Sequence, residues 1–356
     1  MGEFSPRRIV FEIKDYVPGK NPPRPDVVKL ASNENPFGPS PKALEAIIRE
    51  MRNLHVYPEQ KSLLLREALA QKTGLAEENV ICGNGSDDIM QIIGSTYINP
   101  GDEIIITKNS FSLYELIARI FGGTPVMVDL DNQQVSLDKI GAALTDKTKI
   151  IWLTNPHNPT GTFFPKEDLT RFVNALPGHV LLVLDEAYAE FADDPTFPNG
   201  VDYVKAGKNV FVLRTFSKFY GLAGLRIGYG LATKELVAPM FKTKMPFNVS
   251  RLAQAGALAA LEDREFLAAT YANNAAGKKY LYAELERLGL AYKKTEANFI
   301  LINLKKPADP IFLELMRLGV IVRPLTSFGF PEALRVSIGA PEQNEKFIAA
   351  LASIIT

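Results

Sequence analysis

Three side chains that could hold and activate a small organic molecule follow buried strands in the middle of the chain. Lys218 comes shortly after an apolar run at 210–215, and Asp185 directly follows another apolar run at 180–184. Arg226 lies eight residues beyond Lys218, across a turn rich in glycine. An amine can form a Schiff base with an aldehyde, a carboxylate can hold a cationic ring nitrogen, and a guanidinium can bind a phosphate. A lysine at a strand end is most often simply solvated, so the three residues together indicate the chemistry.

The strands that would position these residues are short apolar runs separated by stretches of helix length. Most of the runs lack the alternation of apolar and polar residues that a half-exposed strand shows, which is typical of strands buried on both faces of a largely parallel sheet. Helices between such strands predict a large α/β domain of three layers. We expect these strands at Val80–Cys82, Glu103–Thr107, Pro125–Asp129, Lys149–Thr154, Val180–Asp185, Val210–Thr215 and Ile227–Leu231.

Both ends of the chain differ from this pattern. Residues 1–40 are rich in proline, which favours extended backbone, and they are predicted to form an arm that joins a smaller domain. The large domain is expected over residues 41–250, and the smaller α+β domain over 251–356. Beyond the strands, the pattern predicts helices at 41–51, 62–73, 252–261 and 266–288, strands at 298–303, 320–323 and 333–338, and a terminal helix.

Composition excludes several classes of protein. The 356 residues carry 40 Lys and Arg against 40 Asp and Glu, with no block of like charges that could bind a nucleic acid or an anionic membrane. A single cysteine, Cys82, rules out an intramolecular disulfide and any metal site built from several cysteines. The sequence shows no signal-peptide core and no apolar run long enough to span a bilayer. We therefore expect a soluble protein of the cytoplasm, without a structural metal.

Familiar nucleotide, zinc and hydrolase motifs are missing or incomplete. The segment Gly83-Asn84-Gly85 follows a strand, but the third glycine of a dinucleotide fingerprint would fall at Asp88. The sequence holds no P-loop, no His-Glu-x-x-His pair and no Gly-x-Ser-x-Gly elbow. An amine, an acid and an arginine in the arrangement of Lys218, Asp185 and Arg226 are instead the three anchors that pyridoxal phosphate needs.

The motifs around these anchors resemble a known family. The order and spacing of four segments are similar to the signature of fold-type I pyridoxal-phosphate aminotransferases: 155–161 (NPHNPTG), 185–188 (DEAY), 215–218 (TFSK) and 221–226 (GLAGLR). Four further segments resemble the histidinol-phosphate aminotransferases within that group: 30–40 (LASNENPFGPS), 57–58 (YP), 83–87 (GNGSD) and 334–339 (LRVSIG). The resemblance implies the fold of that group, with a large cofactor-binding domain and a smaller α+β domain.

The resemblance assigns catalytic roles to four residues. Asp185 is expected to pair with the protonated ring nitrogen of the cofactor, which keeps the ring electron-withdrawing. Asn158 and Tyr188 are expected to hydrogen-bond the phenolic oxygen of the ring and to favour its ionised form. Lys218 is expected to carry the cofactor as a Schiff base and then, as a free amine, to move a proton between substrate and cofactor.

The cofactor phosphate needs hydrogen-bond donors and positive charge. Gly85, Ser86 and Asp87 open a helix after a strand, and the free backbone N–H groups of a helix N-terminus suit an anion. Ser217 and Arg226 would add a hydroxyl and a guanidinium. In the family that the chain resembles, an aromatic residue at the position of Phe111 lies on the cofactor ring, and a tyrosine matching Tyr57 reaches the phosphate from the neighbouring subunit.

Substrate binding is expected to depend on two arginines and the arm. Arg335 has a planar fork that suits a carboxylate or a phosphate, and Arg323 is a second candidate. Tyr16 and Asn33 resemble family positions that close over the substrate. The chain departs from the common pattern at His157, which is often asparagine, and at Phe219, where a bulky ring beside Lys218 could reshape the pocket.

The resemblance implies a homodimeric aminotransferase with shared active sites and a ping-pong cycle. In histidine biosynthesis the reaction would convert L-glutamate and imidazole-acetol phosphate into 2-oxoglutarate and histidinol phosphate. Two arginines would also serve an α-carboxylate, so an aromatic amino-acid aminotransferase is an alternative. Two further alternatives are decarboxylation of a phosphorylated amino acid on the same scaffold and a cofactor-binding regulator without turnover. Neither nucleic acid nor membrane is an expected partner.

Overall fold

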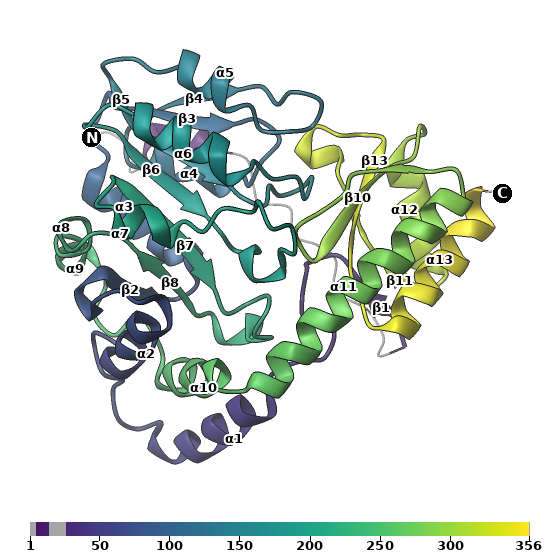
Figure 1. Cartoon of the computed structure of the whole chain (residues 1–356), viewed down its shortest axis with the longest axis horizontal. Helices are drawn as coiled ribbons and strands as arrows, with labels where there is room; N and C mark the ends of the chain where they lie inside the picture. The colour runs from purple at the N-terminus through teal and green to yellow at the C-terminus, as the bar shows by residue number, and fades with distance from the viewer. Residues whose placement is uncertain (1–4, 14–25, 356) are drawn as a thin grey trace.

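The computed structural model describes residues 5–13 and 26–355, and its largest element is a sheet of seven strands (Figure 1). The strand order is β2-β8-β7-β6-β5-β3-β4, and β8 runs in the direction opposite to the other six strands. Six parallel strands therefore bring their carboxyl ends to one edge of the sheet. The bounds are β2 Val80–Gly83, β3 Glu103–Thr107, β4 Thr124–Val128, β5 Thr148–Thr154, β6 Leu181–Asp185, β7 Val210–Thr215 and β8 Gly228–Leu231.

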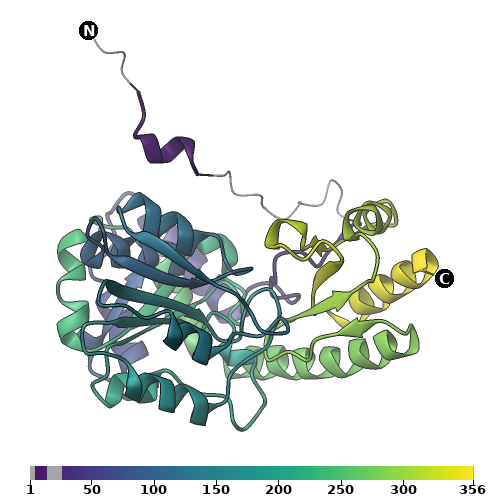
Figure 2. The same ribbon diagram turned by 90° about the horizontal axis from the view of Figure 1, so that it is seen from above.

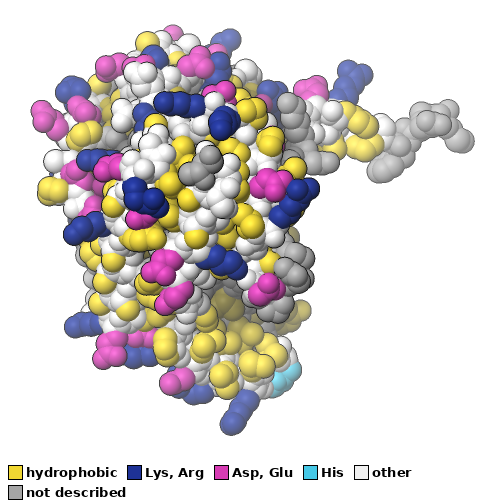
Figure 3. Space-filling model, turned by 90° about the vertical axis from the view of Figure 1, so that its right-hand side faces the viewer, with side chains coloured by type: hydrophobic (Ala, Val, Ile, Leu, Met, Phe, Trp, Pro, Cys, Tyr) yellow, Lys and Arg dark blue, Asp and Glu magenta, His cyan; other side chains and the backbone are white. Residues whose placement is uncertain are grey.

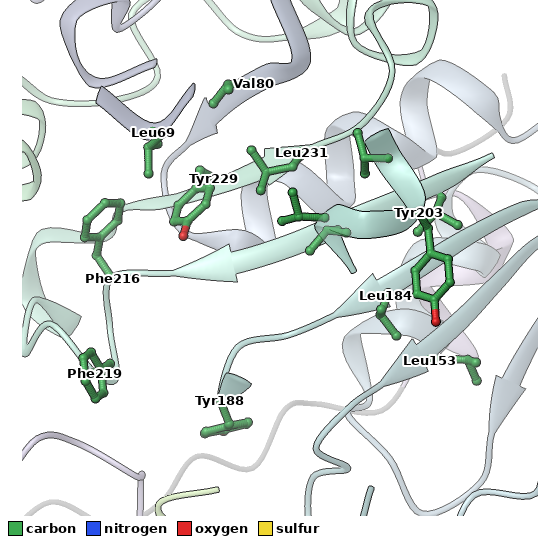
Figure 4. Close-up of a cluster of buried hydrophobic side chains, with 14 of the residues drawn as sticks. Leu69, Val80, Leu153, Leu184, Tyr188, Tyr203, Phe216, Phe219, Tyr229 and Leu231 are labelled. Atoms are coloured by element: carbon green, nitrogen blue, oxygen red, sulfur yellow. The ribbon is translucent and has the colours of Figure 1, made fainter. Parts of the chain in front are cut away.

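The central strands of this sheet are buried on both faces. In β6, Leu182 and Leu184 belong to one core while Leu181 and Val183 belong to the other. Figure 4 shows part of the first core, where Phe216 and Tyr229 lie together beside β7 and β8. Because neighbouring side chains point to opposite faces and both faces are covered, these strands contain runs of consecutive apolar residues, as the sequence predicted.

Helices cover both faces of the large sheet. Helices α2 (Leu63–Thr73), α5 (Leu137–Ala142), α6 (Lys166–Ala175), α7 (Val201–Lys205) and α10 (Arg251–Leu261) contribute to the first core. Helices α3 (Ser86–Tyr97), α4 (Leu113–Ile120), α8 (Lys234–Val237) and α9 (Met240–Thr243) contribute to the second. Helix α1 (Pro41–Glu50) is capped by Ser40, whose side chain accepts a hydrogen bond from the backbone of Ala43, and it packs against α10. The predicted three-layer α/β architecture is confirmed.

A second sheet, of four antiparallel strands, lies beside the first (Figure 2). Its order is β12-β13-β10-β9, with bounds β9 Ala291–Tyr292, β10 Phe299–Asn303, β12 Arg323–Pro324 and β13 Ala333–Ser337. Helices α11 (Arg264–Arg287), α12 (Ala308–Arg317) and α13 (Pro341–Ile355) share its separate core. Helix α11 leads from the large sheet to this small one (Figure 1). The domain boundaries at residues 40 and 250 remain predictions.

The arm adds a strand beside the small sheet. Strand β1 (Val28–Lys29) pairs in parallel with β11 (Val320–Ile321). The sequence predicts one strand over 320–323, whereas the structure divides it in two, because 320–321 pairs with the arm and 323–324 pairs with β13.

The described residues also form short 3-10 helices, at Arg8–Phe11, Met51–Asn53, Glu77–Asn79, Ala189–Phe191, Ala223–Leu225 and Thr326–Phe328. Within the described ranges, none of the helices combines the length and apolarity that crossing a membrane requires.

Candidate active site

A cavity of about 260 Å³ lies where the carboxyl edge of the large sheet meets the arm and the small sheet. Strands β5, β6 and β7 end at its wall with Thr154, Asp185 and Thr215. Ligands of α/β proteins characteristically bind at this edge of the sheet. Of the predicted site residues, twelve line the cavity: Asn33, Ser86, Asp87, Phe111, Asn158, Asp185, Tyr188, Ser217, Lys218, Arg226, Arg323 and Arg335.

Lys218 lies in the cavity wall, three residues after the end of β7. Its Nζ donates a hydrogen bond to the backbone oxygen of Ser32 on the arm, at 2.8 Å, and lies 5.9 Å from the centre of the Tyr188 ring. Burial, together with the positive charge of Arg335, lowers the pKa of the Lys218 amine to about 8. A larger share of this amine is therefore neutral, and so nucleophilic, at physiological pH than in an ordinary lysine.

Asp185 ends β6 with its carboxylate almost wholly buried. Burial raises the pKa of this carboxyl to about 6, and hydrogen bonds from Tyr114 and from the backbone of Ala187 act in the opposite direction. The Tyr114 hydroxyl donates to Asp185 Oδ2 at 2.6 Å, and the Ala187 N–H donates to Oδ1 at 3.0 Å. A buried carboxylate with this pKa favours a cationic partner, because burial penalises its charge.

Tyr114 was not predicted as a site residue. It lies on α4, three residues after Phe111, and its ring stacks on Trp152 at 5.3 Å. Phe111 meets the Tyr114 ring edge-on at 5.7 Å, and both rings line the cavity. The signal in the sequence is the spacing of two aromatic residues by about one helical turn, which is far more often a core pattern.

Four polar side chains of the cavity form two hydrogen-bonded pairs. The Asn33 amide donates to the Tyr188 hydroxyl at 3.0 Å, and Arg335 Nη1 donates to Asn158 Oδ1 at 2.5 Å. The structure thus brings Asn158 and Tyr188, predicted to act on the same atom of the cofactor, into the same cavity as Lys218.

A second corner of the cavity suits a phosphate. Gly85 precedes helix α3 with a φ of 88°, and a Cβ added there would lie 2.5 Å from Arg226 Nη2. Arg226 Nη1 donates to Ser217 Oγ at 3.4 Å, and Nη2 donates to Asp87 Oδ2 at 3.3 Å. The guanidinium can approach the helix N-terminus this closely because residue 85 has no side chain. Gly85 itself is absent from the cavity wall and acts by leaving this space.

Arg323 and Arg335 stand opposite each other on neighbouring strands of the small sheet. They are register partners in the pairing of β12 with β13, and each is only 7% exposed. Arg335 Nη2 also donates to the backbone oxygen of Ala31, a neutral acceptor, at 2.9 Å. Both side chains also line the cavity, where their planar guanidiniums suit a carboxylate or a phosphate.

The remaining predicted residues lie elsewhere. Tyr57 is 76% exposed and stacks on Phe247, and its contact with a neighbouring subunit stays a prediction. Tyr16 lies outside the described residues. His157 is buried next to Thr160, and burial lowers its pKa to about 3, so its ring is neutral. The Phe219 ring packs against Phe191 in the core instead of lining the cavity.

Comparison with known proteins decides the family. The family model described as aminotransferase class I and II matches residues 25–351. The chain belongs to this family. Two relatives of this aminotransferase are the histidinol-phosphate aminotransferases of Moorella thermoacetica, 44% identical over 98% of this chain and 92% of the relative, and of Symbiobacterium thermophilum, 42% identical over 98% of each. The resemblance to histidinol-phosphate aminotransferases is confirmed.

Solved structures agree with this assignment. The crystal structure of histidinol-phosphate aminotransferase from Sinorhizobium meliloti in complex with pyridoxal-5'-phosphate matches with a TM-score of 0.86 and 30% identity, over 92% of this aminotransferase and 90% of that chain. The predicted fold class is therefore confirmed. The residues of the cavity also fit this cofactor, because a buried carboxylate, an amine and a helix N-terminus with an adjacent guanidinium face one space.

Proposed function

We propose that this aminotransferase uses pyridoxal phosphate to exchange the amino group between histidinol phosphate and 2-oxoglutarate, giving imidazole-acetol phosphate and L-glutamate. The observation that carries the substrate assignment is the pair of buried arginines, Arg323 and Arg335, beside Lys218. Histidinol phosphate offers them a phosphate and L-glutamate offers them carboxylates, and both groups suit a planar guanidinium. Relatives named histidinol-phosphate aminotransferase, which are 42–44% identical over nearly the whole chain, support the same substrate.

Bound pyridoxal phosphate supplies a ring that withdraws electrons and stabilises negative charge on the α-carbon of the substrate. Asp185 holds the ring nitrogen in its protonated form, since a cation beside it offsets the burial of the carboxylate. Tyr188 and Asn158 donate hydrogen bonds to the phenolic oxygen of the ring. Phe111 would pack against the ring, and the phosphate would be held by Ser217, Arg226 and the backbone N–H groups of Ser86 and Asp87 at the N-terminus of α3.

Lys218 would hold the cofactor through its amine, and the same amine, when free, would accept the proton from the substrate α-carbon. Its lowered pKa serves both roles, because only the neutral amine can attack an aldehyde or take up a proton. Arg335 lies close enough to lower this pKa by its charge. An anionic substrate on Arg335 would weaken that effect and make Lys218 a stronger base when substrate is present.

A homodimer is part of the proposal. Apolar side chains lie exposed on and next to α1, near Tyr57: Leu44, Ile48, Met51, Leu54, Val56, Leu63, Leu64, Met245 and Phe247. Figure 3 shows hydrophobic side chains gathered at its lower end, where Figure 1 places α1. Such a continuous apolar surface is typical of an interface between subunits. We propose that Tyr57 reaches the cavity of the partner from this surface and that the enzyme works in the cytoplasm.

The test is a half-reaction of the purified, cofactor-loaded enzyme. An amino donor should remove the visible absorption band of the bound cofactor, and the rate is followed against donor concentration. Histidinol phosphate should act at much lower concentration than phenylalanine. The opposite order would identify an aromatic amino-acid aminotransferase, release of carbon dioxide would identify a decarboxylase, and an unchanged band would identify a binding protein without turnover.

A further inference from the structure

Asn33, on the arm, is fixed by hydrogen bonds at all four of its polar positions. Its backbone N–H donates to Ser337 Oγ at 2.8 Å, and its backbone oxygen accepts from Asn298 Nδ2 at 3.0 Å. Its side-chain oxygen accepts from Ser337 Oγ at 3.0 Å, and its amide nitrogen donates to the Tyr188 hydroxyl at 3.0 Å. The residue is 1% exposed and has a φ of 57°, so it is buried in a backbone conformation that asparagine tolerates better than most residues.

The Ser337 hydroxyl determines which way the Asn33 amide faces. This hydroxyl already accepts the backbone N–H of Asn33, so its single hydrogen needs an acceptor, and the Asn33 side-chain oxygen provides it. Turning the amide round would place two further donors against the hydroxyl and remove that acceptor. The amide nitrogen therefore faces Tyr188.

An amide nitrogen can only donate, so the Tyr188 oxygen is the acceptor in this bond. The phenolic hydrogen of Tyr188 is then directed to an acceptor other than Asn33. Tyr188 lines the cavity together with Lys218 and Asn158, where the proposed function has its O–H bind the phenolic oxygen of the cofactor.

We propose that Asn33, oriented by Ser337, is a positioning residue that makes Tyr188 a hydrogen-bond donor to the cofactor. This inference rests on the proposed function, which gives Tyr188 its contact with the cofactor. Asn33 touches the reaction only through Tyr188. A segment near the start of the chain thereby sets the hydrogen-bond direction of a residue that follows β6, 155 positions away.

The change Asn33→Asp isolates this role. Aspartate has nearly the same shape, tolerates a positive φ and can still accept from Ser337. The ionised carboxylate has no hydrogen to give, so Tyr188 would donate to residue 33 instead of to the cofactor. A hydrogen bond to an ionised oxygen favours its ionised form, and losing that bond raises the proton affinity of the bound cofactor.

The experiment records the visible absorption band of the cofactor-loaded enzyme as a function of pH. In Asn33→Asp the midpoint of this titration should rise by about one pH unit, the size expected for loss of one hydrogen bond to a charged group. Tyr188→Phe should raise it similarly, and adding Asn33→Asp to Tyr188→Phe should change it little. Asn35→Asp is the matched control, because it places the same charge on the same arm. The Asn35 amide donates to the backbone oxygen of Phe219 and to the Thr270 hydroxyl and not to Tyr188, so the midpoint of the titration should not change.

Two results overturn the proposal: an unchanged midpoint in Asn33→Asp, or an equal shift with and without the Tyr188 hydroxyl, which would mean that the new charge acts through space. If Asn33→Asp fails to fold, Ser337→Ala takes its place, because it frees the amide to turn without adding charge and should raise the midpoint in the same direction. An unchanged midpoint in Ser337→Ala would then refute the proposal. If Tyr188→Phe itself leaves the midpoint unchanged, the proposed cofactor contact of Tyr188 is wrong, and the inference falls with it.

Discussion

Removing the Tyr114 hydroxyl should weaken cofactor binding in a pH-dependent way. Tyr114 donates to Asp185 at 2.6 Å, and this bond lowers the pKa of a carboxyl that burial has raised to about 6. A hydrogen bond to a charged group contributes about 1.5–3 kcal/mol, or about 1–2 pKa units. In Tyr114→Phe the pKa of Asp185 should therefore rise to about 7–8. A protonated Asp185 must lose its proton before it can hold the ring nitrogen, so binding is penalised wherever the carboxyl is neutral.

The size of this effect follows from the fraction of ionised carboxyl in each protein. With a pKa of about 7.5 in the variant and about 6 in the parent, the dissociation constant for pyridoxal phosphate should rise about 16-fold at pH 6 and about 4-fold at pH 7, with almost no change at pH 9. Titration of the cofactor ring is common to both proteins and cancels in the ratio. Fluorescence or absorbance titration of cofactor-free enzyme at the three pH values measures these constants.

Tyr203→Phe is the matched control for this prediction. Tyr203 is also a buried tyrosine with a hydrogen-bonded hydroxyl, 2.9 Å from Thr170 Oγ1, but it does not line the cavity. Removing the Tyr203 hydroxyl should leave the dissociation constant for pyridoxal phosphate equal to that of the parent at every pH. A loss of cofactor affinity in Tyr114→Phe that is the same at pH 6 and pH 9 would refute the reasoning, because it would show a packing effect instead of a change in the ionisation of Asp185.

Three further outcomes are expected. Gly85→Ala should raise the dissociation constant of the cofactor about tenfold or more, because the new Cβ would lie 2.5 Å from Arg226 Nη2 and displace the guanidinium; equal affinity in an equilibrium titration would contradict the phosphate site. Arg323→Gln should raise the concentration of histidinol phosphate needed for the half-reaction by about 10- to 100-fold, whereas the response to histidinol, which lacks the phosphate, should stay the same. Leu184→Ala should lower the free energy of unfolding by about 2–5 kcal/mol in urea denaturation, since Leu184 is fully buried, and Leu318→Ala, at a site 47% exposed, should change it by less than about 0.5 kcal/mol.

Much of the large sheet could be predicted from sequence because its strands are buried on both sides. Such strands contain runs of consecutive apolar residues, and three of them end with a polar residue that lines the cavity, as β6 does with Asp185. The division between β11 and β12 could not be predicted in this way. It depends on pairing with Val28 and Lys29, which lie almost 300 residues earlier in the chain, and local periodicity holds no information about a partner so distant.

Those site residues that lie in short sequence motifs could be predicted from the sequence. Lys218, Asp185 and Arg226 stand out because an amine, an acid and a guanidinium follow strands of one sheet. Tyr114 could not be found, because its role depends on a hydrogen bond to a residue 71 positions away, and an aromatic residue on the apolar face of a helix is ordinarily a core residue. The bond of Asn33 to Tyr188 spans 155 positions and was equally hidden.

The arm has a consequence for the order in which the enzyme assembles. Ala31 contacts Arg335, and Asn33 contacts Ser337, each across 304 residues of chain. Contacts between such distant positions carry the largest loop-closure cost and form late in folding. During synthesis the arm leaves the ribosome before its partners, which are made 304 residues later. The newly made polypeptide can thus build its large sheet well before it can complete the cavity, and competence to hold the cofactor marks the last stage of maturation.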